Sequence, residues 1–343
     1  MSAENVRIAI DAMGGDRAPR VVVEGVIEAM QKYDYHVVLV GDERKIKKFL
    51  GKYNYPKDKI SIRHASQTIK MGEPAAASFR KKKDSSIAVG LRMVRDREAD
   101  IFISAGNTGA VVAAATLTLR LLTHVERPGI AVAFPTLNEP ILLIDAGANI
   151  ATKPSHLFQY AVMAHAYARY ILHEKNPSIG LLNIGEEESK GTSYIKDTGT
   201  LLRKSKLNFI GNVEAKDIFR GKTNIVLCDG FIGNIVLKVT ESFAEATTKL
   251  LKRELTRRLL PKIGAFLSLP AYRAIKKKID YTEYGGAPLL GVDGAVLISH
   301  GSSNATAIMN AIRVAGEYVK LKVNQHMVEE LEQYGRGILE SVG

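Results

Sequence analysis

The sequence contains one cysteine, Cys228, and no tryptophan among its 343 residues. A single cysteine excludes an internal disulfide framework, and its place at the end of an apolar run favours a buried, inert thiol over a nucleophile. No N-terminal stretch combines basic and apolar regions as a signal peptide does. The longest weakly polar stretch, 109–122, is interrupted by Arg120 and is shorter than the roughly 20 apolar residues of a spanning helix. These absences predict a reduced, cytoplasmic protein that does not cross a membrane.

Standard cofactor and nucleophile motifs are also missing. No G-x-G-x-x-G occurs, and Gly221-Lys222-Thr223 resembles the end of a Walker loop but has Lys216 where that motif needs glycine. The nearest approach to G-x-S-x-G is HGSSN at 300–304, which lacks the second glycine and gives weak support for a serine nucleophile. His165 and His173 lack the H-E-x-x-H spacing, so structural histidines are favoured over a zinc site. We therefore predict neither a metal nor a bound cofactor.

What the chain does have is six apolar, β-branched runs that each end in a small, polar loop. They read IAIDAMGGD, IFISAGNTGA, ILLIDAGANI, IGLLNIGEEESKGT, IVLCDGFIGN and AVLISHGSSN. Such runs, separated by helical segments, predict an α/β protein with a doubly wound, mostly parallel sheet buried on both faces. Ligands of such sheets bind outside the carboxyl ends of the strands. We therefore expect these loops to converge at one edge of the sheet and to hold a phosphate-sized anion.

The alternation of strands and helices continues along most of the chain, which predicts one unit of closely joined α/β lobes over 1–343. Strands are expected at 6–11, 36–40, 60–64, 101–104, 129–134, 141–145, 179–184, 209–210 and 225–228. Helices are expected at 19–30, 85–97, 110–122, 154–173, 192–204 and 305–334.

The net charge of +12 is concentrated in one segment, 246–279, which holds ten basic residues and one acid. A general nucleic-acid binder, with charge spread along a track, is therefore a poor description. Pro261 and Pro270 divide the segment into two short helices joined by a bend, because proline interrupts a helix. Apolar residues recur every three to four positions, which predicts a protruding basic amphipathic hairpin. They are Leu251, Leu255, Leu259, Ile263, Phe266 and Leu267.

Polar residues that could hold the anion stand in the strand-end loops. Asn107 and Thr108 precede a helix, where they either bind an anion or form an ordinary N-cap. Asn149 and Lys153 follow IDAGAN in the same relation, and Lys190 precedes another helix. The carboxylates cannot all face a dianion, so some must hold backbone N–H groups, pair with lysines or act on protons. These are Asp11, Asp16, Asp145 and Asp229.

Seven longer motifs, in order along nearly the whole chain, carry a resemblance to a known family. They are DAMGGD, SAGNTGA, LLIDAGAN, LLNIGEEESKGT, NFIGNVEAKDIF, CDGFIGNIVLK and YGGAPLLGVDGAVLISHGSSN. Together they resemble the bacterial phosphate acyltransferases of phospholipid synthesis, the PlsX family. Departures are conservative, such as Gly129 where alanine is expected, and the resemblance is weakest in the basic hairpin.

The resemblance implies a reaction in which acyl-[acyl carrier protein] and inorganic phosphate give acyl phosphate and free carrier protein. It also implies a fold similar to the isocitrate/isopropylmalate dehydrogenase and phosphotransacetylase group, a homodimer, and peripheral contact with a membrane. If phosphate is the nucleophile, no enzyme side chain is acylated, which agrees with the missing nucleophile motif. The protein then works by positioning phosphate and stabilising the oxyanion.

We assign the predicted site accordingly. Phosphate is bound by Asn107, Thr108, Asn149, Lys153 and Lys190, with Lys190 also counted as catalytic. The thioester side is lined by Asp229, Asn234 and His300. His300 is a candidate proton donor to the departing thiolate, while Lys153 and Lys238 balance charge.

The basic hairpin has three possible partners. Its leucines favour an anionic membrane surface, because their number exceeds what electrostatic steering alone needs. Docking of the acidic acyl carrier protein and packing across a dimer stay open. Two other functions also stay open: a dehydrogenase on a similar scaffold, which would need a nicotinamide site, and a non-catalytic membrane-associated scaffold, which would need only the hairpin.

Overall fold

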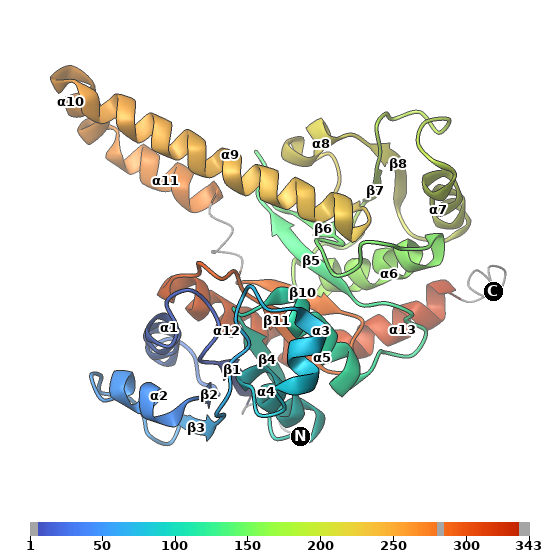
Figure 1. Ribbon diagram of the computed structural model, residues 1–343. Helices are drawn as coiled ribbons and strands as arrows, with labels where there is room; N and C mark the ends of the chain where they lie inside the picture. The colour runs from blue at the N-terminus through green and yellow to red at the C-terminus, as the bar shows by residue number, and fades with distance from the viewer. Residues whose placement is uncertain (1–5, 280–284, 336–343) are drawn as a thin grey trace.

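The computed structural model describes residues 6–279 and 285–335, with the backbone alone for 275–279 (Figure 1). In that part of the chain one sheet holds eleven strands in the order β3-β2-β1-β4-β11-β10-β5-β6-β9-β7-β8. The strands are β1 (Arg7–Asp11), β2 (His36–Gly41), β3 (Ile60–His64), β4 (Ile101–Ser104), β5 (Gly129–Phe134), β6 (Ile141–Ile144), β7 (Ile179–Leu182), β8 (Phe209–Val213), β9 (Ile225–Leu227), β10 (Ala287–Leu290) and β11 (Ala295–Ile298).

The two halves of this sheet run in opposite directions. Strands β1 to β4 and β11 are parallel to one another, and so are β6, β9, β7 and β8. Between them β10 pairs antiparallel with β11 and with β5, and β5 pairs antiparallel with β6. The prediction of a mostly parallel α/β sheet is confirmed. The carboxyl ends of β1, β4 and β11 form what we call the first edge, and those of β6, β9 and β7 form the second edge, opposite to it.

Helices cover both faces of the sheet. The body contains α1 (Arg20–Met30), α2 (Glu43–Leu50), α3 (Ala75–Lys81), α4 (Ser86–Arg95), α5 (Thr108–Leu119), α6 (Pro154–Tyr170), α7 (Ser193–Lys204), α8 (Ala215–Arg220), α12 (Ala305–Lys320) and α13 (Val323–Gly335). Buried side chains of α1, α6, α12 and α13 form one core cluster with the sheet, and those of α4 and α5 form a second. The helix expected at 305–334 is two helices, because Lys322 takes a φ of 50° and ends the first.

Helix α5 crosses the sheet from the first edge to the second. It begins directly after β4, and beyond its end Leu122 N–H donates to Gly291 O, 3.0 Å away, at the carboxyl end of β10. The helix is rich in alanine and buries Ala110, Ala114 and Ala115, whose small side chains allow close packing on the sheet.

An arm projects from the body (Figure 1). It comprises the outer part of α9 (Gly230–Arg257), then α10 (Leu259–Leu267) and α11 (Leu269–Ile279). The prolines do divide the segment, with breaks at Arg258 and Ser268, and Pro261 and Pro270 lie in the first turns of α10 and α11, where the missing N–H costs little. The first helix of the predicted hairpin is the end of a 28-residue helix that starts at β9. No helix in the described part of the chain is long and apolar enough to span a bilayer.

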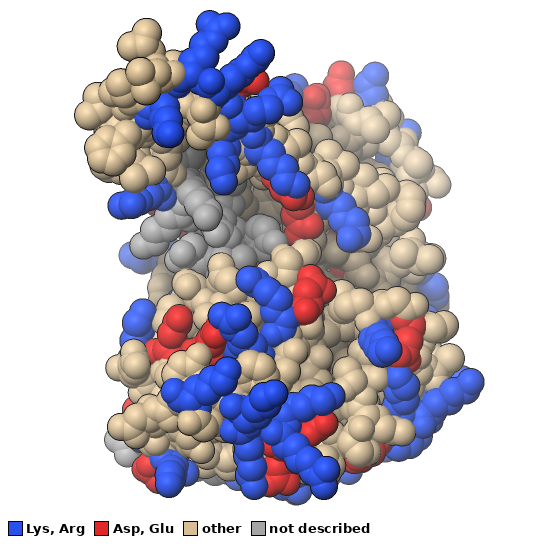
Figure 2. All heavy atoms as spheres, turned by 60° about the vertical axis from the view of Figure 1, so that its left-hand side comes forward, with Lys and Arg blue, Asp and Glu red and all other residues tan. Residues whose placement is uncertain are grey.

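The surface of the arm combines positive charge with exposed apolar side chains. Figure 2 shows Lys and Arg gathered on the arm beside uncharged side chains. Helix α10 buries no residue at all, and Leu259, Leu260 and Phe266 are each at least 75% exposed. Of the six apolar residues predicted to face a membrane, five are exposed and Leu255 is half-buried.

Candidate functional site

The loops that follow β1, β4 and β11 are hydrogen-bonded into one assembly at the first edge. Ser104 Oγ donates to Asp11 Oδ2 over 2.8 Å and accepts from Gly106 N–H over 3.0 Å. Asp16 N–H donates to Gly301 O over 2.8 Å, which joins the β1 loop to the β11 loop. Three of the six predicted strand-end loops therefore do meet.

Asp11 is the internal support of this assembly rather than a ligand of a bound anion. It is 2% exposed, and its Oδ1 accepts from Met13 N–H over 2.9 Å. Burial raises the pKa of this carboxyl, and hydrogen bonds such as that from Ser104 oppose the rise. A side chain on Gly14 would place its Cβ 2.6 Å from Asp11 Oδ2, so only glycine fits there.

Both polar atoms of the Asn107 side chain are hydrogen-bonded to the protein backbone. Its Oδ1 accepts from Ala110 N–H over 3.0 Å, which caps α5, and its Nδ2 donates to three backbone oxygens between 3.0 and 3.2 Å away. Those oxygens belong to Lys70, Met71 and Glu73 in the loop before α3. Of the two possibilities that the sequence left open, the structure shows the N-cap. Thr108 follows at the exposed N-terminus of α5.

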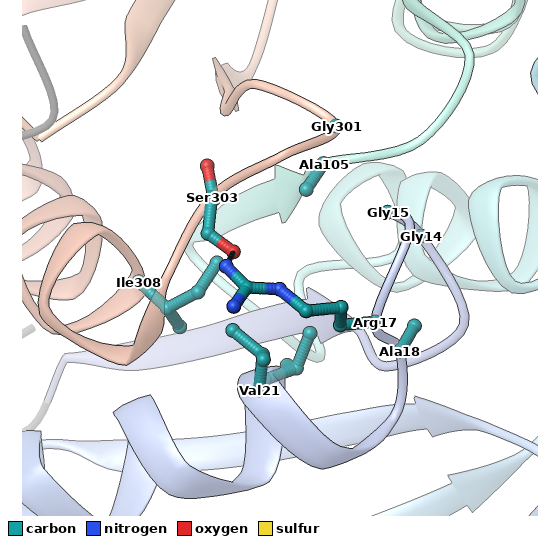
Figure 3. Close-up of a pocket in the computed structure, with 10 residues that line it drawn as sticks. Gly14, Gly15, Arg17, Ala18, Val21, Ala105, Gly301, Ser303 and Ile308 are labelled. Atoms are coloured by element: carbon teal, nitrogen blue, oxygen red, sulfur yellow. Dashed lines mark hydrogen bonds between the residues drawn. The ribbon is translucent and has the colours of Figure 1, made fainter. Parts of the chain in front are cut away.

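Arg17 ties the β1 loop to the loop before α12, as Figure 3 shows. Its guanidinium donates to Ser302 O over 3.1 Å and to Ser303 O over 3.2 Å. The cavity beside it, lined also by Val21 and Ile308, measures about 10 Å³. This volume is the lower limit for one water molecule, so the cavity is too small for a substrate. The role of Arg17 here is to connect two loops by hydrogen bonds.

His300 opens the β11 loop and contacts two polar side chains. Its Nδ1 is 2.7 Å from Ser302 Oγ, and its Nε2 is 3.7 Å from Glu241 Oε2 on α9. The preceding hydroxyl, that of Ser299, is 5% exposed and has no hydrogen-bond partner among the described residues. A buried polar group without a partner is costly, and Ser86 Oγ is the other such atom among the described residues. Because Ser299 also lies next to His300, this end of the first edge is the best candidate for chemistry.

The second edge is built around Asp145, which is fully buried. Its carboxylate accepts from the N–H groups of Ile130, Gly147, Ala148 and Asn149 at 2.8 to 3.0 Å. Burial raises the pKa of this carboxyl, and these four bonds oppose the rise. The prediction that some aspartates hold loop backbone is therefore confirmed at Asp11 and Asp145.

The side chain of Asn149 is also used inside the loop. Its Nδ2 donates to Pro128 O over 2.5 Å and contacts Tyr160 Oη at 2.9 Å. Gly230 N–H donates to Asn149 O over 2.9 Å, which fixes the start of α9 against this loop. Asn149 is thus a structural residue of the second edge.

Helix α9 starts at the second edge in close contact with the β6 loop. Asp229 caps it by accepting from Ile232 N–H over 2.9 Å, and a Cβ on Gly233 would lie 1.9 Å from Asp145 O. Gly147, with a φ of 128°, lies next to Asn234. Asp229 and Asn234 are therefore placed together, but at the edge opposite to His300.

Lys153 and Lys190 are exposed at the second edge, at the starts of α6 and α7. Their loops are joined by a hydrogen bond between the hydroxyls of Thr152 and Tyr194. Burial raises the pKa of the Tyr194 hydroxyl, so it stays neutral there. The N-termini of α6, α7 and α9 gather at this edge beside the two lysines, an arrangement that attracts anions.

The predicted site is thus divided, and the expectation that all the loops meet at one edge is wrong. Asn107, Thr108 and His300 lie at the first edge, and the other predicted phosphate ligands lie at the second. Along β10, Ala287 pairs with Ile298 at the first edge and Leu290 pairs with Gly129 at the second, so the two edges lie about 10 Å apart there. The sheet contains three successive antiparallel pairings, β11–β10, β10–β5 and β5–β6. Because this number is odd, the strands of the two halves run in opposite directions.

Helix α9 connects the two edges. It begins at the second edge with Gly230, and Leu237 packs against the core cluster that includes the buried residues of α5. One turn further along, Glu241 contacts His300. Asn234, Lys238 and Glu241 follow one another at helical spacing along it. The sequence analysis missed Glu241 and Ser302: Ser302 lies in the HGSSN motif discussed above, whereas nothing in the local pattern singles out Glu241.

The predictions for Cys228 and His165 agree with the structure. Cys228 is 2% exposed, and burial raises the pKa of its thiol well above the usual value. His165 is buried and pairs with Glu330 Oε2 over 2.7 Å, as expected of a structural histidine.

Comparison with known proteins shows the family to which the chain belongs. The profile of a family described as "Fatty acid synthesis protein" matches residues 6–326. A phosphate acyltransferase from Geotalea daltonii is 48% identical over 328 residues, which cover 96% of this chain and 95% of the relative. A phosphate acyltransferase from Dictyoglomus turgidum is 47% identical over 330 residues, covering 96% and 98%.

Solved structures show the same fold at low identity. A phosphotransacetylase from Streptococcus pyogenes has a TM-score of 0.62 at 16% identity, with 92% of this chain and 94% of that chain covered. The EutD phosphotransacetylase from Staphylococcus aureus has a TM-score of 0.60 at 16% identity, covering 93% and 95%. The predicted likeness to the phosphotransacetylase fold is confirmed.

Proposed function

Because the chain belongs to the fatty acid synthesis protein family, an acyltransferase family, we propose that it transfers a fatty acyl group from acyl carrier protein to inorganic phosphate. The products are acyl phosphate and free carrier protein, which would supply phospholipid synthesis. In this reaction a C–O bond to phosphate forms, the C–S bond of the thioester breaks, and the proton of hydrogen phosphate ends on sulfur.

The first edge is where we place this chemistry. Thr108 and the residue after it present N–H groups at the exposed start of α5, a setting that binds phosphate. The hydroxyl of Ser299, in the adjacent β11 loop, has no partner in the part of the chain that the structure describes and is a candidate donor to the oxyanion that forms on the thioester carbonyl. This buried, unsatisfied hydroxyl beside His300 is the observation that carries the assignment.

His300 is the candidate proton donor to the leaving thiol. A thiol has a pKa of about 8.5, whereas a phosphate group loses its second proton at about 6. In a tetrahedral intermediate the more acidic group leaves faster, so phosphate would be expelled again unless sulfur is protonated. A histidine that protonates sulfur therefore directs the intermediate toward product.

Lys153, Lys190, Asn234 and Asp229 form a second polar group, at the second edge. We assign to Lys153 and Lys190 the attraction of anionic parts of the substrate at the second edge, with Asn234 and Lys238 lining the path along α9. The phosphate role first given to Asn107 and Asn149 is replaced by a structural one, because their side-chain donors are already used.

The activity itself can be tested directly. Purified protein is mixed with acyl-[acyl carrier protein] and phosphate, and hydroxylamine traps any acyl phosphate as an acyl hydroxamate. Phosphate-dependent hydroxamate is expected. Its absence with every acyl carrier substrate would favour the non-catalytic scaffold, and tightly bound NAD would favour the dehydrogenase.

The phosphate site can be tested through the backbone. Thr108→Pro removes one N–H at the first position of α5, where proline fits a helix, so the KM for phosphate should rise about 10-fold for one lost hydrogen bond to a charged group. Thr108→Ala keeps that N–H and should change the KM little. Lys190→Ala should also leave it unchanged, and a large rise there would return phosphate to the second edge.

The arm is proposed to contact an anionic membrane surface. Its basic residues would face the headgroups while the exposed side chains of α10 enter the interface. The inner part of α9 carries another exposed apolar stripe, with Phe231, Ile235, Val239 and Phe243 between 44% and 72% exposed. We propose that a second copy of the chain covers this stripe, which light scattering of the purified protein would test.

A further inference from the structure

Three side chains from two distant parts of the chain form a connected row at the first edge. Glu241 Oε2 of α9 lies 3.7 Å from His300 Nε2, and His300 Nδ1 lies 2.7 Å from Ser302 Oγ. The Glu241 side chain is 21% exposed, so its carboxylate is partly shielded from water. A base between a carboxylate and a hydroxyl is the arrangement by which proteins orient a histidine for proton transfer.

The backbone fixes which ring nitrogen carries the proton. Ser302 N–H also points at His300 Nδ1, at 3.3 Å, and a backbone N–H can only donate. In the neutral ring Nδ1 is therefore the acceptor and Nε2 holds the hydrogen, which faces Glu241. The Glu241 carboxylate lies 3.7 Å from Nε2, on the side of the ring that this tautomer protonates, so it acts on Nε2–H through its charge and not through a hydrogen bond.

We propose that Glu241 is a positioning residue for His300 and that Ser302 relays the proton to sulfur. This assignment rests on the proposed acyl transfer. As the C–S bond breaks, its electron pair stays on sulfur, which takes the Ser302 Oγ proton. Ser302 Oγ takes the Nδ1 proton of the imidazolium, leaving a neutral ring whose Nε2–H faces the Glu241 carboxylate. The imidazolium is restored by the proton that hydrogen phosphate loses as its oxygen bonds to the acyl carbon.

Substrates whose leaving thiols differ in basicity can distinguish a positioning role of Glu241 in proton transfer from a purely structural role. An alkyl thioester of the pantetheine type releases a basic thiolate that needs protonation, whereas an aryl thioester releases an acidic thiol that does not. General acid catalysis typically contributes about 100- to 10,000-fold, and loss of only its positioning should remove a part of this. Glu241→Gln should therefore lower kcat roughly 10- to 100-fold with the alkyl thioester and less than about 3-fold with the aryl thioester.

The chain offers a matched control on the same helix. Glu245 lies one turn further along α9, exposed and paired with Lys249 at 2.5 Å, so Glu245→Gln makes the same charge change away from the loop. This variant should behave as the wild type with both thioesters. Glu241→Asp keeps a carboxylate and should recover part of the lost rate. The KM for phosphate should stay unchanged in all three.

The outcomes separate this proposal from the proposed function. Equal losses by Glu241→Gln with both thioesters, or no loss at all, would overturn the positioning role while leaving acyl transfer intact. Ser302→Ala should reproduce the selective loss with the alkyl thioester, and an unchanged rate there would remove Ser302 from the relay. Failure of the wild-type enzyme to form hydroxamate from either thioester would instead refute acyl transfer itself.

Discussion

At the scale of single residues, the site shows that the same side chain serves either to bind a ligand or to build the loop that binds it. Asn107 and Asn149 have amide side chains that could bind an anion. However, every donor on these amides already contacts a backbone oxygen or a neighbouring hydroxyl. The phosphate site that we propose at the start of α5 therefore relies on main-chain N–H groups, which the side chains of the sequence do not reveal.

Asn107 is therefore expected to matter chiefly for stability. Asn107→Ala removes an N-cap and leaves three backbone oxygens without their donor, so the free energy of unfolding should fall by about 2–3 kcal/mol. Asn304→Ala removes a cap of α12, in which Oδ1 accepts from Ala307 N–H over 2.8 Å, and should cost only about 1 kcal/mol. Urea denaturation measures both, and equal losses would contradict the added role of the three backbone bonds.

Cys228 gives a prediction about pH. Thiol reagents attack the thiolate, whose fraction grows as the pH rises through the thiol pKa. Because burial raises that pKa, the thiol stays protonated in the native protein at pH 8, and disulfide-exchange reagents should label it far more slowly than in urea. Labelling that is equally fast in native and unfolded protein would show that the thiol is accessible and ionised.

At the scale of elements, close packing of α9 on the β6 loop decides whether the helix can reach His300. Gly233→Ala would place a methyl group 1.9 Å from Asp145 O, so the helix must move, and the free energy of unfolding should fall by about 3 kcal/mol or more.

Gly264 provides the comparison for Gly233. No atom lies within 4 Å of the position where its Cβ would be, so Gly264→Ala in α10 should stabilise that helix by up to about 1 kcal/mol. Thermal denaturation with activity measured in parallel distinguishes the two variants. A Gly233→Ala protein of unchanged stability and rate would show that the contact is not needed.

The elements themselves were predictable where the sequence pattern is local. Apolar, β-branched runs identify the strands, and the helices that follow them begin close to the expected positions, as at Pro154 and Thr108. Helices α2, α3 and α8 were missed because they are short and carry few apolar residues. The break between α12 and α13 was missed because a single residue with positive φ leaves no trace in the apolar periodicity.

At the scale of the whole molecule, strand direction was the property that the sequence did not reveal. Whether a strand joins its neighbour parallel or antiparallel depends on connections between remote segments, here the return of β10 and β11 to the middle of the sheet after the arm. The six strand-end loops were found correctly, but their division between two edges follows from that return. The contact between Glu241 and His300 arises in the same way.

The arm gives a prediction at this scale. Leu259→Glu places a charge on the exposed side of α10, so binding to anionic vesicles should be lost while the rate on dissolved substrates is kept. Co-sedimentation that persists in high salt for the parent protein would indicate buried apolar contact. Lys262→Glu is the charge control, since it should weaken vesicle binding mainly at low salt. If the parent protein loses all vesicle binding in high salt, docking of the carrier protein is favoured instead.

The continuity of α9 has a mechanical consequence. One unbroken helix of 28 residues, about 42 Å long, contacts the carboxyl end of β6 with its first turn, His300 with its middle and α10 with its far half. Because Gly233 packs tightly against Asp145, the first turn of α9 is fixed, and a displacement of its outer end would move Glu241 relative to His300. Under the proposed function, binding of the arm to a membrane would then change the reaction rate without the movement of any loop.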